Sequence, residues 1–591
     1  MSKKVLVFGA GYAGVQAALT LYKKKKKNED IEISIVDRNS FHTLLTELHE
    51  VAGDRVDDEA VIVPLRDIFR YTGVNIIKGD VTGIDFKKNI LKLKSEELSY
   101  DYLVIASGSD PNYYGIPGME EYCFPLWSYD NAIRIREHIK NCFELASQEK
   151  NQAVRKELLT FVVGGGGFTG VELIGEIAQR VKVLCDRYNI DNREVRLVLI
   201  EALPKILNNL KPKSVNKAMN YLEKRLKVEV LVNSQITRLT PNSVELKNGT
   251  AIPTRTLMWT AGVKAACMEE EPDITKGKAC RIIVNEYTQT QYPNVYAIGD
   301  ISAFSNDGHI LPALVEGALQ TGKTAAVNIL ADIRGTGKQK LTPKLHGVMV
   351  SVGSFFAVTD LMGMELPRPF AIITKYLVNM HYLFGIGGFE IIIKYFKHEV
   401  LFKRQKKLLI EKHYSYMTPA FWLVPIRLFL GYSWLVEGIG KINEGWLKTA
   451  MLAGSATDVN SGASVTESGE KVFRIITDVT PSWYAWIANH IVIPNGLIFQ
   501  ILIVITEIGL GLAFISGTFT FIAGIVSFLL TLNFSLSTGL YSYDWWYFPA
   551  ALCMLGGAGR AFGIDHYLIP YLMRQWRYFV RNKRIKLWLF K

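Results

Sequence analysis

The sequence contains few cysteines, and none of them stands in a pair. Its six cysteines are scattered over 591 residues without a Cys-x-x-Cys motif or a zinc-type spacing. Redox disulfides and structural zinc sites in short motifs depend on such spacings. The sequence therefore predicts reduced, mostly buried thiols in a reducing compartment, and no metal site.

The start of the sequence also lacks the pattern of a secretory leader. Residues 1–8 run directly into an apolar β-like segment, without a basic region, an apolar core and a cleavage site. We therefore expect the N-terminus and the part of the chain that follows it to be cytoplasmic.

Acidic residues are in the minority, with 56 Asp and Glu against 68 Lys and Arg and a net charge of +12. A basic balance suits nucleic acid or anionic lipid, and the placement of the charge decides between them. The basic residues gather on both sides of an apolar region, at Lys397, Lys403, Arg404, Lys406, Lys407 and Lys412 before it, and at Arg574, Arg577, Arg581, Lys583, Arg584, Lys586 and Lys591 after it. This positive-inside pattern predicts anionic lipid, rather than nucleic acid, as a partner.

Four apolar segments between these clusters are long enough to cross a bilayer. They lie at 420–440, 494–515, 518–540 and 545–563. We expect a multi-pass protein of the cell membrane with both termini cytoplasmic and the polar stretch 443–482 outside. An earlier apolar stretch, 372–389, is interrupted by Lys375 and His381, which favours an interfacial amphipathic helix. A helical cap packed on the rest of the chain remains the alternative.

A glycine fingerprint stands near the start of the chain, between an apolar run at 4–8 and a helix expected at 12–22. It reads Gly9-Ala10-Gly11-Tyr12-Ala13-Gly14. A second strand at 31–36 ends in Asp37, at the distance where an acid accepts hydrogen bonds from a ribose. Glycines here let the backbone approach a pyrophosphate at the helix N-terminus. The pattern predicts an adenine dinucleotide site.

The same order of elements recurs later in the chain. The fingerprint Gly165-Gly166-Gly167-Phe168-Thr169-Gly170 lies between a strand at 159–163 and a helix at 169–183, and a strand at 195–200 ends in Glu201. An acid at this point favours a free 2′-hydroxyl and hence NADH. Arg196 and Lys205 lie close enough to leave NADPH open, and a purely packing role of the glycines is the remaining alternative.

Two further strand ends carry a resemblance to a known superfamily. Ala106-Ser107-Gly108 follows a strand at 102–105, and Gly299-Asp300 ends a later one. With the fingerprints, they resemble the two-dinucleotide-binding-domain flavoproteins. The resemblance implies an α/β fold with two Rossmann-like domains, FAD at the first fingerprint and at Asp300, and NAD(P)H at the second. With the apolar segments, the fold class becomes α/β plus a C-terminal all-α transmembrane four-helix domain.

Within this superfamily, the first 400 residues or so resemble the type II, non-proton-pumping NADH dehydrogenases. The matching residues are Asp37-Arg38-Asn39 with His42, the stretch 164–176 with Glu172, Trp259-Thr260-Ala261-Gly262, Leu311-Pro312, Gln320-Thr321-Gly322 and His381-Tyr382-Leu383. The resemblance implies FAD, NADH as substrate, and a menaquinone-type quinone as acceptor. A homodimer stays open.

The resemblance also implies the contacts of each group. FAD would contact Gly9, Ala10, Gly11, Tyr12, Ala13, Gly14, Asp37, Arg38, Val81, Ala106, Gly108, Asp300, Val315 and Glu316. NADH would contact Gly165, Gly167, Phe168, Thr169, Gly170, Glu201 and Gly262. The quinone would meet Glu316 and Gln320.

Glu172 is the expected catalytic acid, beside the flavin. Its place on the first turn of a helix also suits an acid that only stabilises the helix dipole. The quinone side departs from the family, which usually has Ala-Gln-x-x-x-Gln: here Gln320 is kept, but Glu316 replaces the first glutamine. Either Glu316 is protonated beside an apolar pocket, or the acceptor or its pose differs.

Missing cysteines separate the chain from relatives of this fold. Disulfide reductases need a cysteine pair near the first helix, and residues 41–51 contain none. Sulfide:quinone oxidoreductases need flavin-side cysteines from both halves of the chain, and none occurs between 281 and 552. An NADH-dependent reductase of another membrane or protein acceptor, or a redox-sensing protein, remains an alternative function.

The C-terminal part resembles the DoxX/DoxD family of small quinone-associated membrane proteins. The matching residues are Arg427, Gly431, Gly438-Ile439-Gly440-Lys441, Gly559-Arg560 and Asp565. The expected domains are FAD-binding segments at 1–115 and 276–340, an NADH-binding domain at 116–275, a membrane-associated helical region at 341–413 and a transmembrane domain at 414–591. This fusion also resembles the dehydrogenases of flavin-based extracellular electron transfer in Gram-positive bacteria.

Three ionisable residues fall within or near the apolar segments, namely Arg427, Glu437 and Glu507. Charges in a membrane are costly and tend to face a partner or a cavity. They either serve quinone access or a redox partner in the membrane, or pair with one another to hold helices together.

Overall fold

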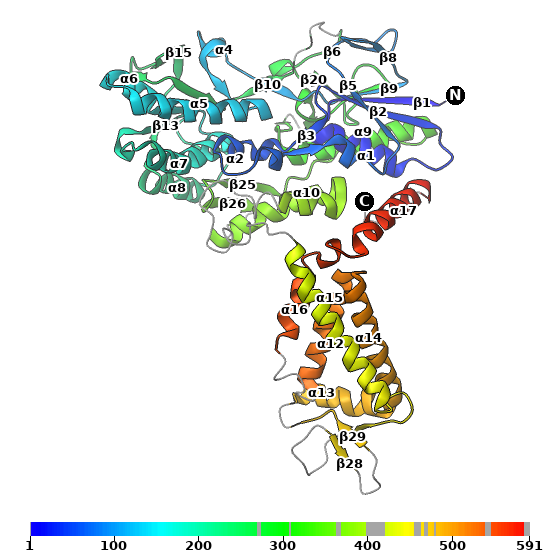
Figure 1. Ribbon diagram of the computed structural model, residues 1–591. Helices are drawn as coiled ribbons and strands as arrows, with labels where there is room; N and C mark the ends of the chain where they lie inside the picture. Colours follow the sequence, from blue (N-terminus) through cyan, green and yellow to red (C-terminus); the bar gives the residue numbers. More distant parts are fainter. Residues whose placement is uncertain are drawn as a thin grey trace. The chain divides into compact units, whose positions relative to one another are not determined.

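The computed structural model describes residues 2–266, 268, 273–306, 309–361, 368–396, 420–453, 463–465, 471–477, 480–537 and 545–583. These residues belong to two compact units, one within Met1–Ser415 and one within Tyr416–Ile585 (Figure 1). Cys267 and the basic residues at 397–412 and beyond 583 lie outside the described residues. Five cysteines are described; all are free thiols, and three of them are buried.

The first unit begins with a five-stranded parallel sheet in the order β21-β9-β1-β2-β5. Its strands are β1 (Lys3–Phe8), β2 (Ile31–Asp37), β5 (Val74–Lys78), β9 (Tyr102–Ile105) and β21 (Val295–Ala297). The central strands are runs of Val, Ile and Leu, and Val5 and Ile35 have no exposed surface. Such runs are typical of a parallel sheet that is covered on both faces.

Two helices far apart in the sequence pack on this sheet. They are α1 (Tyr12–Lys24) and α9 (Val315–Arg334). Their backbones approach so closely that a Cβ at Gly322 would collide with the carbonyl oxygen of Ala13. This contact brings the late part of the chain back to the helix that begins within the first fingerprint.

A second parallel sheet has the order β11-β18-β12-β13-β14. Its strands are β11 (Phe124–Pro125), β12 (Thr160–Gly164), β13 (Arg196–Ile200), β14 (Glu229–Leu231) and β18 (Thr256–Trp259). Helix α5 (Tyr129–Gln148), which begins with a capping box of Ser128 and Asn131, and helix α7 (Phe168–Tyr188) pack beside it. The two Rossmann-like domains predicted from the fingerprints are confirmed.

A three-stranded antiparallel sheet accompanies each parallel sheet in the sequence. The strands are β6 (Val81–Asp85), β7 (Ile90–Leu93) and β8 (Glu97–Ser99) in the first, and β15 (Ile236–Thr240), β16 (Ser243–Leu246) and β17 (Ala251–Pro253) in the second. Short elements complete the two domains, among them β3 (Phe41–Thr43), η1 (Leu45–Glu47), α2 (Leu48–Ala52), η2 (Asp58–Val61), β4 (Ile62–Pro64), α3 (Leu65–Ile68), β10 (Ser109–Pro111), α4 (Met119–Tyr122), α6 (Gln152–Leu158), α8 (Pro212–Asn220) and β19 (Val263–Ala265).

The first unit ends with a hairpin and a long apolar helix. These are β25 (Gly347–Ser351), β26 (Ala357–Leu361) and α10 (Arg368–Phe396). One face of α10 is buried in the unit and includes Lys375 and Leu383, whereas Phe370 and Ile373 on another face are 60% and 52% exposed. The helix is interrupted at Gly388, whose φ is +68°. It therefore packs on the rest of the first unit, as the cap alternative expects, and also exposes apolar side chains, as the interfacial alternative expects.

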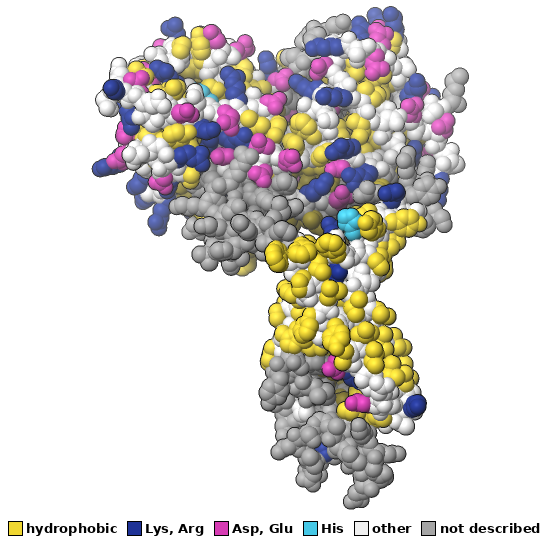
Figure 2. Space-filling view, viewed as in Figure 1, with side chains coloured by type: hydrophobic (Ala, Val, Ile, Leu, Met, Phe, Trp, Pro, Cys, Tyr) yellow, Lys and Arg dark blue, Asp and Glu magenta, His cyan; other side chains and the backbone are white. Residues whose placement is uncertain are grey.

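The second unit is a helical bundle with an apolar surface (Figure 2). Its helices are α12 (Leu423–Asn443), α13 (Ser482–Ile487), α14 (Gly496–Ser516), α15 (Thr520–Ser537), α16 (Tyr547–Met554) and α17 (Asp565–Lys583). Leu430, Trp434 and Phe514 form its core, and the indole of Trp434 donates to Ser527 at 2.9 Å. By length and composition, three helical stretches of this unit could cross a membrane, namely Ala420–Asn443, Ser482–Ser516 and Thr520–Ser537. The same holds for Phe370–Phe396 of the first unit.

The last expected span differs from the structure. Helix α16 has only eight residues, and the chain then turns through η11 (Ala558–Arg560). The break occurs at a glycine-rich turn, where Gly557 has a φ of +84° that a helix does not accommodate. The segment 545–563, expected to be one of the four spans, is therefore not one continuous helix.

The three ionisable residues singled out in the apolar segments, Arg427, Glu437 and Glu507, each have a partner nearby. Arg427 donates to the carbonyl oxygens of Ala558, Ala561 and Phe562. Lys441 donates to both oxygens of the buried Glu507, at 2.7 and 2.9 Å, and lies 3.6 Å from Glu437. Arg427 thus bonds to backbone carbonyls, and Glu437 and Glu507 lie beside Lys441. The three residues do not pair with one another, although the second alternative from the sequence expected this.

Candidate active site

The first fingerprint forms a tight backbone turn at the carboxyl end of β1. Gly9 has a φ of +104°, and a Cβ there would collide with the carbonyl oxygen of Ala106. A Cβ at Gly11 would meet no atom within 4 Å, so the backbone of the turn faces open space. The carboxylate of Asp37 accepts hydrogen bonds from the N–H groups of Ala10 and Asn39, both at 2.7 Å. The turn and the acid are held together as a dinucleotide site requires.

The second fingerprint repeats this geometry. The carboxylate of Glu201 accepts from the N–H groups of Gly166 at 2.7 Å and Leu203 at 2.8 Å. Gly167 faces open space as Gly11 does. The predicted NADH residues Phe168, Thr169 and Gly170 begin α7, and Gly165 and Gly262 have φ angles of +110° and +91°.

The late Gly-Asp motif returns to the first domain. Asp300 accepts from the hydroxyl of Ser109 at 2.9 Å, and burial raises the pKa of its carboxyl. The hydroxyl oxygen of Ser107 is buried and has no hydrogen-bond partner among the described residues. A buried polar atom normally finds a partner. Ser107, between Ala106 and Gly108, therefore fits a cofactor that would contact this strand end.

The remaining FAD candidates lie at element boundaries around the first sheet. Val81 begins β6, Val315 begins α9, and Tyr12 and Ala13 are buried at the start of α1. Arg38 is exposed beyond the end of β2.

The two candidates for the quinone side hold a neighbouring strand segment. Both oxygens of Glu316 accept hydrogen bonds from His346, one from its backbone N–H and one from its ring, each at 2.9 Å. The Gln320 amide exchanges two hydrogen bonds with the backbone of Lys344, at 2.7 and 2.9 Å. Both side chains point to the segment before β25, and the partly exposed Glu316 lies in polar surroundings.

Glu172 lies on the first turns of α7, where α7, α2, β25 and α10 meet. Ser351 donates to its Oε1 with both backbone N–H and hydroxyl, each at 3.1 Å. The Nδ1 atom of His49 lies 3.8 Å from its Oε2. Burial raises the pKa of Glu172 to about 7, against the opposing charge of Lys375 and the Ser351 bonds. A carboxyl group with this pKa can both take up and release a proton near neutral pH.

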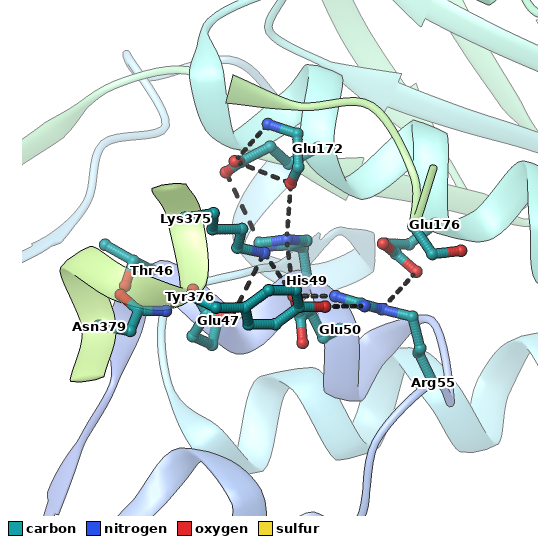
Figure 3. Close-up of polar contacts among 12 residues, drawn as sticks. Thr46, Glu47, His49, Glu50, Arg55, Glu172, Glu176, Lys375, Tyr376 and Asn379 are labelled. Atoms are coloured by element: carbon teal, nitrogen blue, oxygen red, sulfur yellow. Dashed lines mark hydrogen bonds and ion pairs between the residues drawn. The ribbon is translucent and has the colours of Figure 1, made fainter. Parts of the chain in front are cut away.

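A buried ionic cluster continues behind Glu172 (Figure 3). Lys375 of α10 contacts Glu50 and lies 3.4 Å from Glu47, and Asn379 donates to Glu47 at 2.8 Å. Arg55 contacts Glu50 and lies 3.3 Å from Glu176. Buried charges of this kind are stable only when they are paired. The cluster therefore links α10 to α2 and α7.

Sequence reasoning identified Glu172 but missed the rest of this cluster. His49 and Glu50 lie on α2, Arg55 in the loop after it and Ser351 on β25, and no motif marks them. Lys375 left a signal, because it interrupts an apolar helix at a position that the structure buries. His381, noted in the same stretch, is exposed, whereas the neighbouring Tyr382 meets the ring of His42 at 3.0 Å.

The chain is similar to well-described proteins over its first two thirds. The sequence pattern of the pyridine nucleotide-disulphide oxidoreductase family matches residues 3–322. The type II NADH:quinone oxidoreductase of Staphylococcus haemolyticus is 32% identical over 407 residues, which cover 66% of this chain and 98% of that protein. The Staphylococcus aureus protein of the same name is 31% identical over 405 residues, with the same coverage. About a third of this chain has no counterpart in these relatives.

Solved structures agree on the fold. NDH2 from Plasmodium falciparum, in complex with NADH, has a TM-score of 0.61 at 16% identity and covers 68% of this chain and 98% of its own. The sulfide:quinone oxidoreductase from Aquifex aeolicus has a TM-score of 0.54 at 18% identity, with 66% and 92% covered. At such identities the likeness extends to the fold alone.

Proposed function

Because this chain belongs to the pyridine nucleotide-disulphide oxidoreductase family, among the type II NADH:quinone oxidoreductases, we propose that it oxidises NADH and reduces a membrane quinone. The observation that carries the proposal is that one chain holds two dinucleotide turns and that a mostly buried carboxyl, Glu172, lies on the helix that begins at the second turn. We take a menaquinone-type quinone as the acceptor.

The residues around the two turns have distinct tasks. Gly9, Gly11, Asp37, Asp300 and the orphan hydroxyl of Ser107 would hold FAD, which when bound supplies the hydride and electron chemistry. Glu201 and the turn at 165–167 would hold NADH, since a carboxylate accepts from a free ribose hydroxyl and repels a phosphate.

Glu172 supplies a proton in this scheme. One NADH, one quinone and one proton give NAD⁺ and one quinol, so each turnover consumes a proton from the medium. In its protonated form Glu172 can donate that proton to a quinone oxygen and then reload. The neighbouring cation Lys375 stabilises the carboxylate that remains.

The test is a stoichiometry measured under anaerobic conditions on the detergent-purified full chain. NADH consumed and menaquinone analogue reduced should agree one to one, and Glu172→Gln should slow quinone reduction about tenfold or more. A matched Glu390→Gln variant removes an exposed carboxylate of α10 and should keep full activity. NADH oxidation without quinol formation would contradict the proposal and would favour another membrane or protein acceptor.

The second unit supports a location in the membrane. Its apolar exposed helices and the apolar face of α10 suit a bilayer, and we propose that the first unit lies on the cytoplasmic side. The burial of Lys375 in the enzyme favours an interfacial position of α10 over a span.

The second unit also has a feature suited to anionic lipid. A hollow of about 540 Å³ is lined by Arg560, Asp565, His566, Ile569, Pro570, Met573 and Arg574. The carboxylate of Asp565 accepts hydrogen bonds from the backbone N–H groups of Phe519 and Thr520 and from the Thr520 hydroxyl, so its oxygens already have partners within the unit. Two guanidinium groups beside an apolar helix face suit a lipid phosphate and its acyl chains.

Native mass spectrometry of the full chain with phosphatidylglycerol checks this contact. Replacing Arg560 and Arg574 by Gln should release the bound lipid, whereas Lys448→Gln, which removes an exposed basic charge of the same unit outside the lining, should retain it. Equal retention of phosphatidylcholine, or no loss in the double variant, would contradict a site for anionic lipid.

A further inference from the structure

Ser351 stands between Glu172 and His49. Its hydroxyl lies 3.1 Å from Oε1 of Glu172 and 3.3 Å from Nε2 of His49. The Ser351 backbone N–H, also 3.1 Å from Oε1, holds the carboxyl in place independently of the hydroxyl. One hydroxyl proton thus faces two acceptors, and it can bond to only one of them at a time.

His49 is a neutral ring in this setting. Burial, Lys375 and Arg55 together lower its pKa well below the usual value, whereas a hydrogen bond to the backbone of Thr46 opposes them. Because that bond favours the protonated ring, the ring donates in it. With Nε2 facing Ser351, Nδ1 carries the proton, and Nε2 is left as an acceptor.

The two protonation states of Glu172 then require two different positions of the Ser351 hydroxyl proton. When Glu172 is ionised, Ser351 donates to it. When Glu172 is protonated, its own O–H can donate to Ser351 Oγ, and Ser351 donates onward to His49. No heavy atom has to move between the two arrangements.

We propose that Ser351 and His49 are positioning residues that keep Glu172 hydrogen-bonded in both protonation states, which lets it load and discharge a proton without rearrangement. This proposal rests on the proposed function, in which Glu172 gives its proton to a quinone oxygen. The proton that leaves is replaced by one from the medium, and the Ser351 hydroxyl only rotates, so no charge is gained or lost by the pair.

The other charged groups around Glu172 stay paired during this change. Lys375 faces it from α10, Glu47 and Glu50 face it from η1 and α2, and Arg55 and Glu176 lie behind them. These groups set the mean potential at the carboxyl. Among the hydrogen bonds of Glu172 to the described residues, the one with the Ser351 hydroxyl can reverse its direction between the two states, whereas the Ser351 backbone N–H donates in both.

The test is an infrared pH titration of the full-length protein in detergent, without NADH or quinone. The carboxyl band of Glu172 is identified by its loss in Glu172→Gln. Ser351→Ala removes the donor to the carboxylate but keeps the backbone N–H, and should raise the pKa of Glu172 by about 1. Ser351→Thr restores a hydroxyl and should restore the pKa.

A double-mutant cycle separates the role of His49 from its bulk. His49→Leu removes the acceptor, which disfavours protonated Glu172, but it also makes the site more apolar, which favours it. The apolar effect is present with or without the Ser351 hydroxyl and cancels in the cycle. The effect of His49→Leu on the pKa of Glu172 is measured twice, once with Ser351 present and once in the Ser351→Ala variant. The change with Ser351 present should be lower than the change in Ser351→Ala by about 0.5 or more. His49→Asn serves as the second variant if His49→Leu lowers the FAD content.

The matched control is Ser354→Ala. Ser354 lies three residues after Ser351, and its hydroxyl contacts Gln179 of α7, so its loss should leave the pKa of Glu172 unchanged. An unchanged or lowered pKa in Ser351→Ala, or additive effects of Ser351→Ala and His49→Leu, would overturn the proposal. The titration needs no turnover, so it can succeed or fail independently of quinone reduction.

Discussion

At the scale of single residues, the account depends on acids whose surroundings differ. Asp37 and Glu201 each accept two backbone N–H groups at the end of a strand. Glu172 is mostly buried, with 15% of its side chain exposed, and its pKa is raised to about 7. In the proposed function the first two acids serve the recognition of the nucleotides, and the third serves proton transfer.

The pKa of Glu172 predicts how quinone reduction depends on pH. Below pH 7 the group is protonated and can donate, and above pH 7 the donor is lost. The rate of quinone reduction should therefore fall as pH rises through about 7, whereas reduction of the enzyme by NADH should not follow this titration. Stopped-flow rates between pH 5.5 and 9 check this. In Glu172→Gln the profile should be flat, and a wild-type profile that is flat over this range would exclude Glu172 as the donor.

Glu201 should determine the preference for NADH. Glu201→Ser removes the carboxylate that would repel a 2′-phosphate, so the ratio of kcat/KM for NADH to that for NADPH should fall about tenfold or more. Glu229→Gln is the control, since Glu229 pairs with Arg196 at the opposite end of the same sheet and should leave the ratio unchanged. An unchanged ratio in Glu201→Ser would show that other residues select the nucleotide.

At the scale of secondary-structure elements, the contact of α1 with α9 joins the two segments that we propose to form the FAD-binding domain. Gly322→Ala places a Cβ against the backbone of Ala13 and should force the helices apart. Overpacking of this kind costs about 1–3 kcal/mol, so the melting temperature and the FAD content should both fall. Gly337→Ala, where a Cβ would meet no atom within 4 Å, should change neither. Full FAD content in Gly322→Ala would contradict a cofactor site that depends on this contact.

The elements also show what the sequence could predict. Both fingerprints, their strands and the acids that follow were predictable because glycine turns, apolar strands and helix starts are local signals. The cluster around Glu172 was not, because Ser351, His49 and Lys375 meet only through tertiary packing. The last membrane segment was misjudged because apolar composition continues through the break at Gly557.

At the scale of the whole molecule, the chain combines two units. The first matches its staphylococcal relatives over nearly their whole length, and the second is a helical unit that those relatives do not share. The pairing of Lys441 with Glu507 and the bonds of Arg427 to backbone carbonyls account for these three charges inside the helical unit by packing. On this account the second unit anchors the enzyme, and the chemistry belongs to the first.

The most direct test of the central claim is anaerobic stopped-flow flavin absorbance on the full chain and on a chain that ends at residue 415. NADH should bleach the flavin rapidly in both, and a soluble menaquinone analogue should restore it rapidly in both. Rapid bleaching that no quinone reverses would contradict the NADH:quinone oxidoreductase account, and recovery in the full chain alone would contradict the assignment of the chemistry to the first unit.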